Sequence, residues 1–281
     1  ENAADLAQRI DGDDLDVNPG DVQVRQNDFG EGGHNTQYSA FVGSQLENGL
    51  GLAVLYSGQT GTEWRDESDD DVNDLAVKFR YELSGSSEIY GKFSYFDVKS
   101  RTPGGLTVAQ YQQDPFQNTR PTDYWEGDRK GFDVGYLNTL SDTQEFEIRA
   151  YYNESFRKSV LINGAGNLVH QPRNYEVFGI EPRYTQRFGW GATTHDVTVG
   201  YRYLRERGDD NTVTELTPTT GAFGATTSFD NATDAHSVYV DDRIAIGSWR
   251  ITPGVRFEKI DTDRKERANG QTYEESNTKA L

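Results

Sequence analysis

The stretch Asn73-Asp74-Leu75-Ala76-Val77-Lys78-Phe79-Arg80-Tyr81-Glu82-Leu83 decides the fold. Every second residue from Leu75 to Leu83 is apolar, and the residues between them are charged or small. Because successive side chains of a strand point to opposite faces, this segment predicts a β-strand with one apolar and one wet face. A β-barrel in a membrane produces this pattern with its apolar face toward lipid and its polar face toward the lumen.

The same alternation recurs in about ten segments, whose connections are alternately short and long. Outer-membrane barrels have short periplasmic turns and long extracellular loops, whereas a soluble β-sandwich has no reason to gather its long loops at one end. We therefore predict an all-β fold, an antiparallel transmembrane β-barrel, with a soluble sandwich as the alternative. The predicted strands are 36–43, 50–58, 73–83, 88–98, 130–140, 144–157, 174–188, 195–206, 236–246 and 249–262. The predicted long connections are 59–72, 99–129, 158–173 and 207–235.

The composition excludes several other classes of protein. Mean hydropathy is −0.81, and no stretch approaches the roughly 18 uninterrupted apolar residues that a membrane-spanning helix needs. A net charge of −18 argues against nucleic acid as a partner, because phosphate binding needs clustered lysine and arginine. The absence of cysteine removes disulfide frameworks and thiolate metal sites.

Residues 1–33 differ from the rest and are expected to form an acidic loop or extended arm. Asp14, Asp16 and Asn18 have the start of a calcium-loop spacing. However, Pro19 stands where the sharp turn needs glycine, and Arg25 stands where the bidentate glutamate belongs, so the motif fails. We assign residues 34–281 to the N-terminal part of a barrel domain.

Asp242 interrupts an otherwise apolar strand face formed by Val238, Val240, Ile244 and Ile246. A carboxylate on a lipid-facing surface is tolerated only near the interface or beside a partner, so we expect one of these two arrangements. Aromatic residues near strand ends are typical of the girdle at a membrane interface. They are Tyr56, Trp64, Tyr136, Trp190 and Trp249.

A set of short strings is colinear from about His34 to the C-terminus. The strongest are Arg173-Asn174-Tyr175 with Gly179-Ile180-Glu181-Pro182-Arg183-Tyr184, Val199-Gly200-Tyr201-Arg202-Tyr203-Leu204, and Ile251-Thr252-Pro253-Gly254-Val255-Arg256-Phe257-Glu258. Weaker ones are Leu55-Tyr56-Ser57-Gly58 with Trp64-Arg65, Pro103-Gly104-Gly105-Leu106, and Thr119-Arg120-Pro121. In these strings the chain resembles the ferric dicitrate transporters of the TonB-dependent receptor family.

The resemblance implies a 22-stranded barrel of the bacterial outer membrane, filled by an N-terminal plug. It implies capture of an anionic iron chelate from outside and transport driven by the TonB complex. About ten strands are roughly half of such a barrel, and the sequence contains neither a plug-like domain nor a TonB-box segment. We therefore expect the chain to be the first part of the barrel. Its expected partners are the chelate, outer-membrane lipid, and the TonB complex through a plug not present in this chain.

The expected site consists of arginines, whose planar donor fork matches carboxylate oxygens. From their place among the matching strings, Arg157 and Arg173 resemble two ligand-contacting arginines of the family. Arg120, Arg129 and His170 are secondary candidates in the same extracellular region. A third family arginine has no counterpart in the segment Ser228–Thr233, so a smaller or less charged chelate is an alternative to citrate.

Other functions have weaker support in the sequence. The four histidines are far apart, and no serine lies in a nucleophile-elbow string, so we expect neither an enzyme nor a metal or cofactor site. A passive porin or substrate channel is the main alternative to an importer. A plug in the complete protein would favour the importer.

Overall fold

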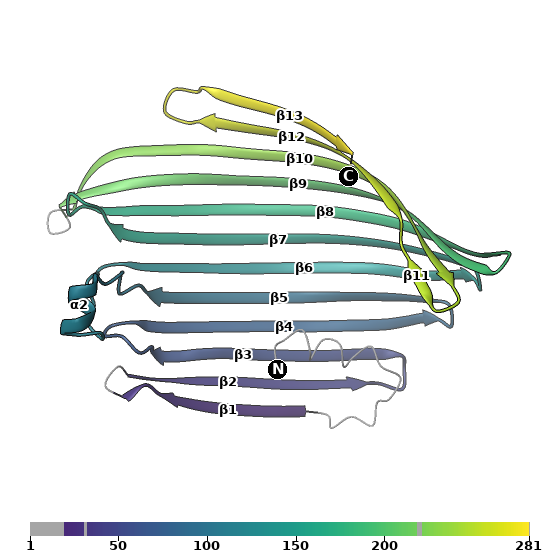
Figure 1. The fold of residues 1–281 in the computed structure, drawn as a ribbon, viewed down its shortest axis with the longest axis horizontal. Helices are drawn as coiled ribbons and strands as arrows, with labels where there is room; N and C mark the ends of the chain where they lie inside the picture. Colours follow the sequence, from purple (N-terminus) through teal and green to yellow (C-terminus); the bar gives the residue numbers. More distant parts are fainter. Residues whose placement is uncertain (1–19, 31–32, 218–220, 281) are drawn as a thin grey trace.

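The computed structural model describes residues 20–30, 33–217 and 221–280, which form a curved antiparallel sheet of 13 strands and one short helix (Figure 1). No helix in this part of the chain is long and apolar enough to cross a membrane. The elements are β1 (Gly20–Asp28), β2 (His34–Gln45), β3 (Leu50–Thr62), β4 (Asp69–Ser84), β5 (Ser87–Arg101), α2 (Val108–Gln113), β6 (Tyr124–Ser141), β7 (Gln144–Ile162), β8 (Leu168–Trp190), β9 (Thr193–Thr217), β10 (Ala222–Ile246), β11 (Trp249–Ile251), β12 (Gly254–Glu266) and β13 (Thr272–Ala280).

Each strand pairs antiparallel with the next one along the chain, from β1 to β10 and then through β12 to β13, while the short β11 pairs with β10. Two-residue turns at 85–86, 142–143 and 191–192 lie at one end of the strands, and α2 lies at the other end with the longer loops (Figure 1). The predicted sequential antiparallel meander is confirmed, and so is the position of the short turns at one edge.

The predicted strand boundaries are wrong at the loop end. The segments predicted as loops 59–72, 158–173 and 207–235 consist largely of strand, because β3, β7 and β9 continue to Thr62, Ile162 and Thr217. Among the strand connections that the structure describes in full, only the one between β5 and β6 is a long loop, and it carries α2. Above a membrane both faces of a strand meet water, so the hydrogen-bond ladder continues while the apolar alternation disappears.

The N-terminal segment also differs from the expected loop or arm. Gly20–Asp28 forms β1 and pairs with His34–Val42 of β2. The sequence pattern missed this edge strand because its residues are largely exposed on both faces. Residues 1–19, which include the acidic cluster and most of the failed calcium motif, lie outside the described residues.

The two faces of the sheet differ in chemistry as the sequence predicts. Val77 is the register partner of Phe93, which in turn pairs with Phe132, so these side chains share one face. Among the described residues only three apolar side chains are buried: Ala53, Val98 and Val160. The apolar face therefore has no protein layer packed against it, and lipid is the environment that covers such a face.

The opposite face carries a lattice of hydrogen-bonded charges. Glu147 accepts a hydrogen bond from the Tyr90 hydroxyl and pairs with Arg183 on β8. Farther along the sheet, Arg202 pairs with Glu181 at 3.1 Å and donates to the Tyr151 hydroxyl, also at 3.1 Å. This polar face is the lumen wall of the barrel.

Asp242 is tolerated on the apolar face because it has a partner close to a short turn. Its Oδ2 lies 2.7 Å from Nδ1 of His195, whose side chain is 10% exposed. The His195 ring stacks on Phe188 with centroids 5.0 Å apart, and the Thr193 hydroxyl contacts its Nε2 at 2.8 Å. Both arrangements expected for Asp242, a partner and a place near the strand end, are therefore present.

Candidate functional site

The two main candidate arginines lie on the polar face, on the loop side of the apolar band. Arg157 of β7 and Arg173 of β8 are direct register partners. Arg157 lies an even number of positions from Glu147 on β7, and Arg173 lies an even number from Arg183 on β8. All four side chains therefore share one face. Phe178 of β8 faces outward, and Arg173 lies five residues closer to the loop end of the strand, a distance of about 17 Å. The pair therefore stands on the part of the wall nearest the extracellular loops.

Arg173 and Arg157 differ in how their charges are compensated. Arg173 Nε lies 3.1 Å from Oδ1 of Asp210 on β9, and the two side chains are 33% and 21% exposed. Arg157 is exposed and has neither an ion pair nor a hydrogen-bond partner within the described residues. Of these two neighbouring guanidinium groups, therefore, only that of Arg173 is paired with a carboxylate within the described residues.

Asp210 is itself held by a tyrosine. The Tyr175 hydroxyl donates to Asp210 Oδ1 at 3.0 Å, and the ring lies over Gly208, where an added Cβ would come within 2.4 Å of it. Tyr175 lies above the apolar band, and burial together with the hydrogen bond to Asp210 raises its pKa above the ordinary value. The sequence reasoning missed Asp210 and Tyr175, and Asp210 fell in the segment predicted as loop 207–235.

Arg129 of β6 joins the same face. Its register partner on β7 is Ser155, two residues from Arg157, so Arg129 and Arg157 are diagonal neighbours about 7–8 Å apart at Cα. Arg129 is exposed. Three of the five predicted residues therefore lie together: Arg129, Arg157 and Arg173.

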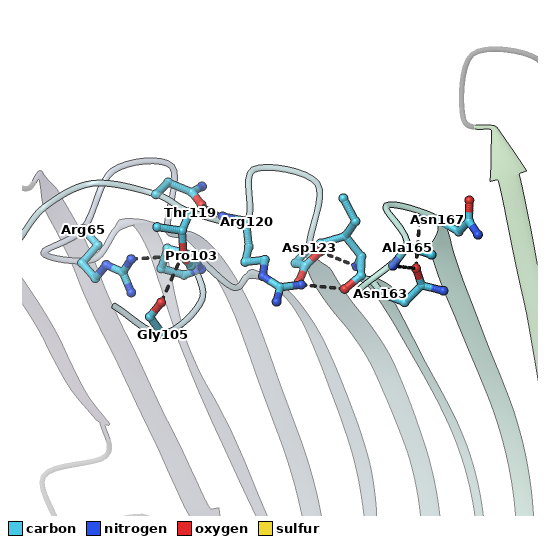
Figure 2. A network of polar contacts seen from close by, with 11 residues as sticks. Arg65, Pro103, Gly105, Thr119, Arg120, Asp123, Asn163, Ala165 and Asn167 are labelled. Carbon is cyan, nitrogen blue, oxygen red and sulfur yellow. Dashed lines mark hydrogen bonds and ion pairs between the residues drawn. The ribbon is translucent and has the colours of Figure 1, made fainter. Parts of the chain in front are cut away.

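Arg120 and His170 are engaged elsewhere. Arg120 Nη1 donates to the Ile162 carbonyl at 2.6 Å, and Asp123 Oδ1 accepts from the Ile162 amide at 2.7 Å, which ties loop 102–123 to the end of β7 (Figure 2). His170 is three residues from Arg173 on a continuous strand, so it lies on the opposite face, where its Nε2 contacts Glu215 at 3.0 Å. The described residues contain no cluster suited to a metal ion.

Loop 102–123 is also tied to loop 63–68. Arg65 is 9% exposed, and its side chain donates to three backbone carbonyls: that of Gly104, that of Pro103 at 3.0 Å and that of Gln117 at 2.6 Å. The Asp66 amide adds a bond to the Phe116 carbonyl at 2.8 Å. Figure 2 shows how Arg65, Thr119, Arg120 and Asp123 link consecutive loops along the rim. We call this set of contacts the rim network.

An antiparallel meander with one lipid-facing apolar side, one charged side and its long loops at one end defines the class of outer-membrane β-barrels. The sequence matches the family described as TonB dependent receptor-like, beta-barrel over residues 79–280. The chain belongs to this family of bacterial outer-membrane proteins.

Solved structures agree with this assignment. The ferric citrate transporter FecA in its unliganded form is 34% identical with a TM-score of 0.84, and the match covers 93% of this chain and 40% of that one. The siderophore receptor PiuA from Acinetobacter baumannii is 14% identical, with a TM-score of 0.74 and coverage of 93% and 45%. The ferric-catecholate import receptor Fiu from E. coli K12 is 11% identical, with a TM-score of 0.73 and coverage of 93% and 50%. The last two likenesses concern the fold alone.

Proposed function

We propose that this chain is part of the barrel of a TonB-dependent receptor that imports an anionic iron chelate such as ferric citrate. In this proposal the complete protein has a 22-stranded barrel and a plug that couples it to the TonB complex. Arg157 and Arg173 bind the chelate from neighbouring strands, and Arg129 extends the cationic surface. The similarity to the ferric citrate transporter supports the substrate class.

The observation that carries the proposal is the direct pairing of Arg157 with Arg173. Like charges directly opposite on one sheet face are destabilising, and Asp210 compensates only one of them. An anion bound between the two guanidinium groups would remove that repulsion. Planar carboxylates suit it well because each can accept two parallel N–H bonds from a guanidinium.

Replacing Arg173 with alanine in the complete receptor is expected to weaken ferric citrate binding by roughly ten- to a hundredfold, because a charge-assisted contact contributes about 1.5–3 kcal/mol. Arg173→Lys should recover only part of the loss, since an ammonium group is a point charge without the two-pronged geometry. Both affinities would be measured by titration. Unchanged affinity in both variants would remove Arg173 from the site.

Asp210 competes with an anionic ligand for Arg173, so Asp210→Asn is expected to tighten binding. An ion pair of this exposure contributes about 0.2–1 kcal/mol, which gives at most a roughly fivefold gain. Asp209→Asn is the matched control, because Asp209 is the next residue on β9, lies on the opposite face and contacts Asn174 and Asn211. A loss of affinity in Asp210→Asn would contradict the competition.

Uptake by the complete protein separates the importer from a passive channel. Accumulation of labelled ferric citrate should stop when the proton motive force is collapsed, since TonB-driven transport needs energy. Uptake that continues, together with open-channel conductance in a planar bilayer, would favour the porin.

A further inference from the structure

One exposed arginine of the polar face is absent from the site described above. Glu258 of β12 accepts a hydrogen bond from the Ser237 hydroxyl of β10, so the two side chains share the polar face. Arg264 lies an even number of positions from Glu258 on β12 and therefore faces the same side. It is exposed and has neither an ion pair nor a hydrogen-bond partner in the described part of the chain. Its register partner on β10 is Asn231.

The Arg264 guanidinium is held in place by an aromatic ring. Its Cζ lies 3.9 Å from the ring centroid of Phe229. Phe229 is in turn the register partner of Asp210, the carboxylate that pairs with Arg173. A ring in this position fixes the guanidinium plane through a cation–π contact and leaves its N–H edges free to donate.

The spacing allows Arg264 and Arg173 to act on one ligand. Three strand steps of about 4.8 Å and two residues of about 3.4 Å separate them, which gives roughly 16 Å between their Cα atoms along the sheet. Each arginine side chain extends several ångströms from its Cα atom, so the two guanidinium groups can lie closer together than the Cα atoms do. The remaining gap suits a small chelate with carboxylates on opposite sides.

We infer that Arg264 is a third ligand-contacting arginine, which binds the anionic chelate from the β12 side while Arg157 and Arg173 bind it from the other. This inference rests on the proposed function and deepens it. It requires a ligand with at least two separated carboxylate edges. A chelate with a single anionic edge would engage only one side of this arrangement.

The test uses the complete receptor and ferric citrate as the probe. Arg264→Ala is expected to weaken binding by roughly tenfold, the effect of one charge-assisted contact. The control is Lys265→Ala, which removes a charge from the next residue of β12, on the opposite face, and should leave affinity unchanged. Thermal unfolding of both variants checks that the barrel is intact.

A second variant moves the arginine across the ladder. Asn231→Arg combined with Arg264→Asn places the guanidinium on the neighbouring strand at the same register position and should restore most of the lost affinity. Normal binding by Arg264→Ala, or no recovery in the exchange variant, would overturn the inference. If Arg173→Ala weakens binding while Arg264→Ala does not, only this inference fails. If neither variant changes the affinity, the proposed function fails as well.

Discussion

Replacing Val77 with arginine is expected to destabilise the folded receptor in a bilayer by about 2–4 kcal/mol, the cost of an arginine on the lipid face near the midplane. Val77 lies in the middle of β4, on the face that continues through Phe93 and Phe132. No second layer of protein covers this face among the described residues. Equilibrium folding of the complete receptor into lipid vesicles at a series of denaturant concentrations would measure the change.

Two further substitutions make this test specific for lipid. Tyr81→Arg changes the same face closer to the short turn, where the cost should fall to about 0–1 kcal/mol because the side chain reaches the interface. Val77→Leu keeps the position apolar and should have little effect. Equal stability of Val77→Arg and the parent receptor would show that this face does not contact lipid.

The fold was predictable where the bilayer imposes its pattern on the sequence. In β4 each residue meets either lipid or a wet interior, so the alternation from Leu75 to Leu83 specifies the strand. In the outer half of β9, polar residues such as Asp209 and Asp210 occupy both faces. Nothing in their chemistry distinguishes that strand from a loop. The extension of β7, β8 and β9 above the membrane was therefore not predictable from periodicity.

The site was predictable only in part for the same reason. The resemblance identified Arg157 and Arg173, and the strands bring them into direct register. The sequence pattern predicts one loop around His170 and Arg173, but both lie on β8, where a separation of three positions puts them on opposite faces. Asp210 and the proposed contact Arg264 come near these arginines only through cross-strand pairing, which no local pattern reveals.

Three of the weaker matching strings have a structural explanation. Trp64-Arg65, Pro103-Gly104-Gly105-Leu106 and Thr119-Arg120-Pro121 are far apart in the sequence but meet in the rim network. Arg65 donates to Gly104 and Pro103, and the Thr119 amide donates to the Pro103 carbonyl at 3.0 Å. These strings therefore resemble the family at positions that join the loops rather than at positions on the polar wall.

Arg65→Ala is expected to release loop 102–123 from loop 63–68. The substitution leaves three carbonyl groups without their charged donor. Unsatisfied buried acceptors cost about 1–3 kcal/mol each, and water will reach some of them. We therefore expect the free energy of local opening of these loops to fall by about 2–3 kcal/mol. Amide hydrogen exchange of the complete receptor would measure it, at the Asp66, Thr119 and Asp123 amides, which are hydrogen-bonded within these loops.

The expected change at these amides is a roughly 30- to 150-fold faster exchange, with amides in the middle of β6 unaffected. Arg101→Ala is the control, because Arg101 is an exposed arginine beside the same loop whose contact with the Pro121 carbonyl is long, at 3.4 Å. It should accelerate exchange far less than Arg65→Ala does. If exchange in Arg65→Ala equals that of the parent receptor, the loops are held together by the remaining backbone contacts, and Arg65 does not organise the rim.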